Sequence, residues 1–136
     1  MARPKSTQPT DGELEILKLL WEAGPCTLGP ICTDLRRNRP VATTTVATML
    51  TVMLTKGLVT RNSGRRGYLW SAKVGREATT RRLVDRLLDR AFDGSARLLV
   101  AHLVDSKKLS IKDRQKVLEL LERGTAKSRQ GEAPDL

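Results

Sequence analysis

The chain has 136 residues and a formal net charge of +10, with 39% hydrophobic and only 3% aromatic residues. This length allows one modest core or two small units, and a core built mainly from Leu, Val, Ile, Ala and Met favours helices over a β-sandwich. No apolar run approaches the roughly 20 residues that span a bilayer, and the first residues lack the apolar stretch of a signal peptide, so we expect a cytoplasmic protein without a membrane partner.

The sequence contains few residues that could form a catalytic site or bind a metal ion. It has one histidine, His102, and two cysteines, Cys26 and Cys32, whose spacing is not that of a zinc half-site. No nucleophile is paired with a general base, and no glycine-rich motif that cradles phosphate is present. We therefore expect no catalytic residue, no metal and no cofactor, and two free thiols in a reducing cytosol.

The N-terminal third predicts a flexible arm and two helices. Residues 1–9 hold two prolines and form the expected arm. Thr10-Asp-Gly-Glu13 has the form of a capping box, which predicts the start of a helix that Gly24 and Pro25 end. Thr27 is the expected cap of the second helix. The apolar stripe of this helix has i, i+3, i+4, i+7 spacing and consists of Leu28, Ile31, Cys32 and Leu35.

A third helix is predicted from Thr43 to Lys56, where Gly57 can take the left-handed conformation that ends helices. One face is apolar, with Val46, Met49, Leu50 and Met53, and the other carries Thr44, Thr48, Thr51 and Thr55, with Thr45 beside them. Two strand-like runs at 58–61 and 68–71 then flank a basic loop at 62–67. Three helices followed by a hairpin is the order of a winged helix-turn-helix domain, whose third helix enters the major groove of DNA.

The charge distribution favours DNA as the partner of this domain. Residues 1–75 carry 11 Lys and Arg against 5 Asp and Glu. The segment from Leu35 to Arg76, here called the basic tract, contains no Asp or Glu. Its nine basic residues are Arg36, Arg37, Arg39, Lys56, Arg61, Arg65, Arg66, Lys73 and Arg76. Because a carboxylate near phosphate would repel it, we expect this tract to face a polyanion.

Three further helices are predicted after Val74, at about 76–92, 95–105 and 110–124. Helices this short are not expected to bury all their apolar stripes alone, which predicts a two-fold homodimer interface. We therefore expect a DNA-binding domain at 10–74, a dimerisation domain at 75–124 and a disordered tail at 125–136. The candidate dimerisation residues are Leu87, Phe92, Leu99, Leu103, Leu118 and Leu121.

Four motifs together resemble the penicillinase-repressor (BlaI/MecI) family, which has CopY-type copper repressors as relatives. They are Leu19-Leu-Trp-Glu-Ala-Gly-Pro25, Thr43-Thr-Thr-Val-Ala-Thr-Met-Leu50, Lys56-Gly57 and Gly64-Arg-Arg-Gly-Tyr68. The resemblance covers about Thr10 to Arg123. It implies a homodimeric transcriptional repressor that holds an inverted-repeat DNA operator related to TACA/TGTA and dimerises through its C-terminal helices.

The resemblance also assigns residues to DNA contact. Thr45 and Thr48 match the family's recognition-helix threonines, Thr44 matches a neighbouring position that touches DNA, and Arg65 matches the arginine of the wing. Hydroxyl groups bond phosphates or bases, and a threonine methyl can contact thymine. The candidate DNA-binding residues are therefore Thr43, Thr44, Thr45, Thr48, Thr51, Arg61, Arg65 and Arg66.

The chain departs from the family pattern in three places. Many members have an arginine where this chain has Val52, so either the operator differs or phosphate contact has moved to Arg36, Arg61 and Arg66. The Asn-Phe bond cleaved in antibiotic-responsive members aligns with His102-Leu103, which leaves open whether a regulatory protease or a sensor relieves repression. The tail has no cysteine, which excludes copper sensing through the CopY-type motif.

Three other functions are compatible with parts of this pattern. A non-specific architectural protein would bind nucleic acid without depending on an inverted repeat, whereas a winged-helix protein-interaction module would not bind DNA at physiological salt. A redox- or metal-responsive regulator would use Cys26, for which the sequence offers no neighbouring ligand.

Overall fold

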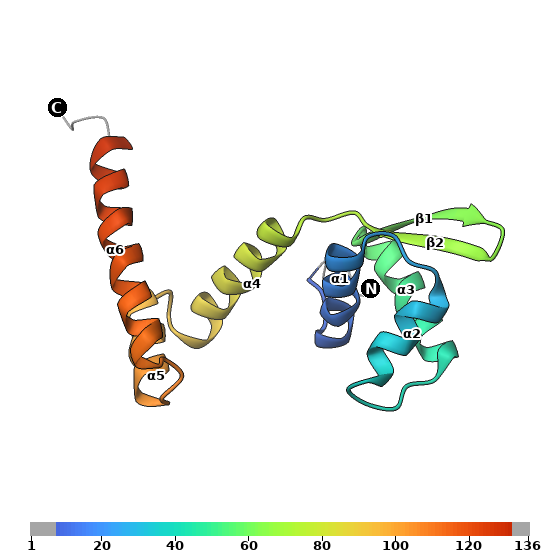
Figure 1. Cartoon of the computed structure of the whole chain (residues 1–136), viewed down its shortest axis with the longest axis horizontal. Helices are drawn as coiled ribbons and strands as arrows, with labels where there is room; N and C mark the ends of the chain where they lie inside the picture. The colour runs from blue at the N-terminus through green and yellow to red at the C-terminus, as the bar shows by residue number, and fades with distance from the viewer. Residues whose placement is uncertain (1–7, 132–136) are drawn as a thin grey trace, which may run out of the picture. The chain divides into compact units, whose positions relative to one another are not determined.

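The computed structural model describes residues 8–131, with side chains described as far as Gly124. The chain divides into two compact units between Asp85 and Arg86. The first holds α1 (Asp11–Ala23), α2 (Leu28–Arg36), α3 (Thr43–Lys56), β1 (Val59–Gly64), β2 (Gly67–Ala72) and the first part of α4 (Arg76–Ala91) (Figure 1). The second holds the rest of α4, α5 (Ala96–Asp105) and α6 (Ile111–Gly131). This order confirms the mostly helical fold, with a winged helix-turn-helix followed by three helices.

Local sequence signals set the ends of α1 and α3. At the start of α1, the backbone N–H of Glu13 donates to Thr10 Oγ1 at 3.2 Å, and the backbone N–H of Thr10 donates to Glu13 Oε1 at 2.9 Å. Both halves of the predicted capping box are therefore formed. At the end of α3, Gly57 takes the left-handed conformation with a φ of 80°. The bounds of α3 are those that the sequence predicts.

The core of the first unit lies where the apolar faces of the first three helices meet the hairpin. Its buried side chains are Ile16, Leu17, Leu20, Ile31, Cys32, Leu35, Val46, Leu50, Met53, Leu58, Val59 and Trp70. Trp21 packs at the edge of this core, and its indole N–H donates to the carbonyl of Val74 at 2.9 Å, which ties α1 to the segment before α4. Because one face of α3 is buried here, its threonine face is turned outward.

The hairpin is longer and its turn tighter than the sequence predicts. The strands pair in antiparallel register out to Gly64 opposite Gly67, so only Arg65 and Arg66 lie between them. Gly67 has a φ of 98°, and a Cβ on Gly64 would lie 3.2 Å from the Gly67 carbonyl oxygen. Glycine at both positions therefore permits the two-residue connection, and residues 62–64 are strand instead of loop.

A single antiparallel bridge adds a third segment to the hairpin. The backbone N–H of Cys26 donates to the carbonyl of Trp70 at 2.9 Å, and the N–H of Trp70 donates to the carbonyl of Cys26 at 2.8 Å. The chain between α1 and α2 is thus fixed against β2. A bridge of one residue pair leaves no alternating apolar pattern in the sequence, so the sequence does not predict it.

The second unit has no core among its described side chains, because none between residues 86 and 124 is buried. Its helices are set by local caps: the hydroxyl of Ser95 accepts from the N–H of Leu98 at 3.1 Å, and the hydroxyl of Ser110 accepts from the N–H of Asp113 at 3.0 Å. The ring of Phe92 meets that of His102 edge-on, with 5.8 Å between centroids. The apolar side chains of these helices remain partly or fully exposed.

Three expected boundaries differ from the structure. The helix predicted to end at Gly124 continues as α6 to Gly131, since one glycine inside a helix costs only about 1 kcal/mol. Residues 125–131 of the predicted tail are therefore helical, and 132–136 lie outside the described residues. The break between the units falls inside α4 and not before it. Thr27 occupies the cap position of α2, but its side chain forms no capping hydrogen bond.

The predicted domain functions are not decided by these boundaries, and the division into a DNA-binding and a dimerisation domain stays a prediction. In the part of the chain that the structure describes, no helix combines the length and the hydropathy needed to cross a membrane.

A buried ion pair joins the start of α1 to the end of α3. The Nζ atom of Lys56 lies 2.6 Å from Glu13 Oε1, and the two side chains are only 9% and 4% exposed. Lys56 also donates to the carbonyl of Gln8 at 3.3 Å, and this hydrogen bond holds the end of the predicted arm against α3. Residues 1–7 of that arm lie outside the described residues. The paired residues are 43 positions apart, and no periodic pattern in the sequence connects them.

Replacing Lys56 with Met is expected to destabilise the protein by about 3–5 kcal/mol, because the Glu13 carboxylate is left buried without its cation. The double variant Glu13→Gln, Lys56→Met keeps a side chain that can cap α1 and removes both charges, so it should recover most of this loss. Urea unfolding followed by circular dichroism measures both variants. A single variant as stable as the unchanged protein would contradict the structural role of this pair.

Candidate nucleic-acid interface

The outward side of α3 carries a threonine ridge, defined as Thr44, Thr48, Thr51 and Thr55, all of them exposed. Thr48, Thr51 and Thr55 each donate their hydroxyl hydrogen to the backbone carbonyl four residues earlier, at 2.9, 3.1 and 3.2 Å. Because these hydrogens are used within the helix, an incoming partner meets hydroxyl lone pairs and methyl groups. Thr43 and Thr45 are exposed in the first turn of the same helix.

Arg36, at the end of α2, fixes the turn that leads into α3. Its Nε donates to the carbonyl of Val41 at 3.0 Å, and its Nη2 donates to Thr43 Oγ1 at 2.6 Å. The amide groups of the first turn of a helix have no intrahelical acceptor, and Ala42, at the cap position of α3, provides no side-chain acceptor for them. A helix start of this kind is suited to bind phosphate.

The hairpin places arginines beside the threonine ridge. Arg65 and Arg66 are exposed at its turn, and among the described residues neither they nor Arg61 forms an ion pair. The guanidinium carbon of Arg61 lies 4.0 Å from the centroid of the exposed Tyr68 ring, which is a cation–π contact. A groove of about 310 Å³ lies between α3 and the hairpin, and its lining includes Thr51, Arg61, Arg66 and Tyr68. A stacked guanidinium beside a groove suits the DNA backbone.

Folding neutralises part of the basic tract with carboxylates from α1. Lys56 is buried against Glu13, and Arg39 donates to both oxygens of Glu15 at 2.7 and 3.0 Å. The expectation that Lys56 faces a polyanion is therefore wrong, since its ammonium is sequestered in an ion pair. Six basic residues of the tract are exposed and form no ion pair among the described residues: Arg36, Arg61, Arg65, Arg66, Lys73 and Arg76. Four of these, Arg36, Arg61, Arg65 and Arg66, lie at the α2–α3 turn and on the hairpin.

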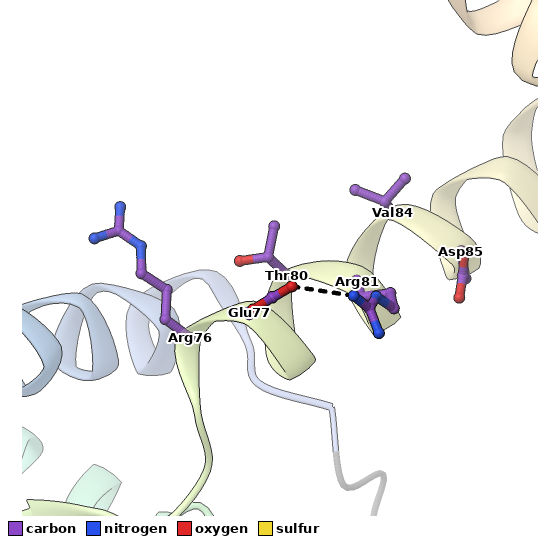
Figure 2. Close-up of a pocket in the computed structure, with 6 residues that line it drawn as sticks. All are labelled: Arg76, Glu77, Thr80, Arg81, Val84 and Asp85. Carbon is purple, nitrogen blue, oxygen red and sulfur yellow. Dashed lines mark hydrogen bonds and ion pairs between the residues drawn. The ribbon is translucent and has the colours of Figure 1, made fainter. Parts of the chain in front are cut away.

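A hollow on α4 is a weaker candidate site. It measures about 530 Å³ and is lined by Arg76, Glu77, Thr80, Arg81, Val84 and Asp85, all from one helix (Figure 2). Arg81 Nη2 donates to Glu77 Oε1 at 3.1 Å, one turn away along this helix. The surface of a single helix with both signs of charge is open to solvent, and these residues include no nucleophile paired with a base.

The two thiols lie apart from any cluster of metal-binding side chains in the described part of the chain. The described residues contain no group of three or more His, Cys, Asp or Glu side chains that could hold a metal ion. Cys32 is buried in the core, as predicted, and Cys26 is half-buried. Burial, followed by the charge of Asp34, raises the pKa of the Cys26 thiol. A raised pKa lowers the fraction of reactive thiolate at neutral pH, which disfavours redox sensing at Cys26.

Residues 9–123 match the protein family described as "Penicillinase repressor". The chain belongs to the penicillinase repressor family. The penicillinase repressor of Bacillus licheniformis is 20% identical to it over 118 residues, which cover 87% of this chain and 92% of that protein. The penicillinase repressor of Staphylococcus aureus is 16% identical over 117 residues, covering 86% and 93%.

Among solved structures, the chain is similar to monomeric BlaI of Bacillus licheniformis in complex with the blaP half-operator. The TM-score is 0.46 and the identity 21%, covering 52% of this chain and 85% of that chain. Family membership itself makes the protein a DNA-binding transcriptional repressor and not an enzyme.

The structure gathers all candidate DNA-binding residues on α3 and the hairpin, and each of them is exposed. Their contact with DNA stays a prediction. Sequence reasoning missed Tyr68, which supports the Arg61 guanidinium. The signal for it is the strand register: Arg61 lies opposite Trp70, which places Tyr68 diagonally across on the same face of the hairpin.

In a Cys32→Ala variant, alkylation of Cys26 by iodoacetamide is expected to show a pH midpoint above that of the same chain unfolded in urea. The reason is that burial disfavours the thiolate form, as the raised pKa indicates. The measurement is the reaction rate as a function of pH in the folded and the unfolded protein. A folded midpoint equal to or below the unfolded one would restore Cys26 as a candidate sensor.

Proposed function

We propose that the protein is a homodimeric, sequence-specific repressor that binds an inverted-repeat operator with α3 in the major groove of each half-site. The observation that carries this proposal is the exposed threonine ridge next to the hairpin arginines, which form no ion pair with any residue that the structure describes. Hydroxyl and methyl groups are suited to base edges, and guanidinium groups to phosphates, so the two elements divide specificity from affinity. Binding at a promoter would block access of RNA polymerase.

Three parts of the proposed interface would take different parts of the DNA. The uncapped start of α3 suits a phosphate, the threonine ridge suits base edges, and Arg61, Arg65 and Arg66 suit the backbone beside the hairpin. The operator class that we propose is the TACA/TGTA-like inverted repeat implied by the family resemblance. The protein would act in the compartment that holds the DNA, the cytoplasm.

The second unit supports the homodimer. None of its described side chains is buried, and large apolar groups are exposed on each of its helices, including Leu87, Leu98 and Leu118. Apolar surface removed from water contributes about 25 cal/mol per Å², so a second copy of this unit is the simplest partner that would bury it. A two-fold dimer would also fix the spacing of the two half-sites.

Derepression through a regulatory protease or a sensor partner stays a prediction. In the family the cleaved bond is Asn-Phe, and the aligned pair here is His102-Leu103 in α5, where the ring of His102 packs against Phe92. Cleavage at this bond would need both a different protease specificity and local unfolding of the helix.

Thr48→Ala and Thr45→Ala are expected to weaken binding to the protein's own promoter DNA by about tenfold or more and to leave binding to random DNA nearly unchanged. Arg65→Ala should weaken both and reduce the slope of log affinity against log salt by about one. Fluorescence anisotropy on the two duplexes over a salt series gives these values. Equal losses for all three variants on both duplexes would exclude direct readout by α3.

Leu118→Glu is expected to shift the protein from dimer to monomer at micromolar concentration, because a charge is placed in the apolar surface that a second copy would cover. Sedimentation velocity measures the assembly state. Lys116→Gln, an exposed change two residues away, is the matched control and should leave the dimer intact. A Leu118→Glu variant that sediments like the unchanged protein would place the interface elsewhere.

A further inference from the structure

A second groove runs along α3 on the opposite side of the threonine ridge from the hairpin. It measures about 450 Å³, and its lining comes from the start of α1 and from α3: Thr10, Glu13, Thr44, Thr45, Thr48, Met49 and Val52. We call it the α1-side groove. The groove on the hairpin side is lined from the other flank of the helix, by Ala47, Leu50 and Thr51. The two grooves therefore flank the same ridge.

The α1-side groove differs from its counterpart in charge. Its lining contains no Lys or Arg, whereas Arg61 and Arg66 line the groove on the hairpin side. Its one carboxylate, Glu13, is 3% exposed and accepts from Lys56 and from the backbone of Thr10, so its charge is compensated. A surface without a free cation or a free anion is suited to neither phosphate nor a cationic ligand.

Apolar groups line the part of this groove formed by α3. Val52 and Met49 are half-buried there. Gly12 of α1 leaves room for Met49, since a Cβ at Gly12 would lie 2.8 Å from the Met49 Cε atom. Thr48 uses its hydroxyl hydrogen on the carbonyl of Thr44, which leaves its methyl group and an acceptor oxygen for a partner. At Thr48, Met49 and Val52 a partner therefore meets methyl and thioether groups and an acceptor oxygen.

We propose that the α1-side groove receives the C5 methyl group of thymine and that Val52 is a specificity-determining residue for it. In the major groove, the thymine methyl is the one apolar group that a standard base pair presents. The Val52 and Met49 side chains supply apolar contact to it beside Thr48, which lies on the ridge. This inference rests on the proposed insertion of α3 into the major groove and adds the base group that the helix recognises.

The test replaces thymine with uracil, which removes the C5 methyl group and leaves the hydrogen-bonding groups of the base unchanged. Three duplexes are compared by fluorescence anisotropy: the promoter fragment, the same fragment with deoxyuridine in place of thymidine, and a scrambled sequence. The unchanged protein is expected to bind the thymine duplex about three- to fivefold more tightly than the uracil duplex for each methyl group buried. Single replacements along the fragment should confine the effect to equivalent positions in the two half-sites.

Protein variants separate the groove from the rest of the interface. Val52→Ala should lower the thymine-to-uracil affinity ratio toward one, because the Val52 part of the apolar contact is lost. Arg66→Ala, on the other side of the ridge, should weaken binding to both duplexes and keep the ratio. Circular dichroism of both variants checks that the fold is retained, and the ratio compares two duplexes on one protein, so partial unfolding cancels.

Each outcome decides one claim. If the unchanged protein binds the thymine and uracil duplexes equally but still prefers the promoter to the scrambled sequence, the methyl readout is overturned and the proposed function stands. A thymine preference that Val52→Ala does not reduce would overturn the assignment to this groove. Equal affinity for promoter and scrambled duplexes would overturn the proposed function and this inference with it.

Discussion

The ion pair between Glu13 and Lys56 is the constraint on which the geometry of the interface depends. One carboxylate accepts both the backbone N–H of Thr10 and the ammonium of Lys56, so it caps α1 and anchors the end of α3 at the same time. Arg36 holds the other end through Val41 and Thr43. A helix fixed at both ends can present its outward residues in one orientation, which recognition of base edges requires.

The two sides of α3 carry different chemistry because different elements pack against them. The hairpin contributes arginines, with Arg61 stacked on Tyr68, and this side suits the phosphate backbone. The start of α1 contributes Thr10 and Glu13, and the charge of Glu13 is compensated by Lys56. This side of α3 is apolar where Met49 and Val52 line it. The proposed interface thus combines a long-range electrostatic attraction with a short-range contact surface, as the proposed sequence-specific repressor requires.

Features set by neighbouring residues could be predicted from the sequence, and features set by distant residues could not. The capping box at Thr10 and Glu13 and the left-handed Gly57 are local, and both are found where expected. The pairing of Lys56 with a carboxylate of α1 depends on how α1 and α3 pack, so counting charges along the basic tract assigned Lys56 to the wrong surface. The tight turn at Arg65 and Arg66 depends on strand register, and α6 passes through Gly124 because surrounding helix formers outweigh one glycine.

The most direct test of the account is fluorescence anisotropy of the unchanged protein on its own upstream promoter DNA and on a scrambled duplex at about 150 mM salt, where non-specific binding is weak. A sequence-specific repressor is expected to prefer the promoter by about a hundredfold or more, since specific binders commonly exceed their own background by about 10³ or more. Equal affinity for the two duplexes would contradict sequence-specific recognition by α3 and would favour an architectural role for the basic surface.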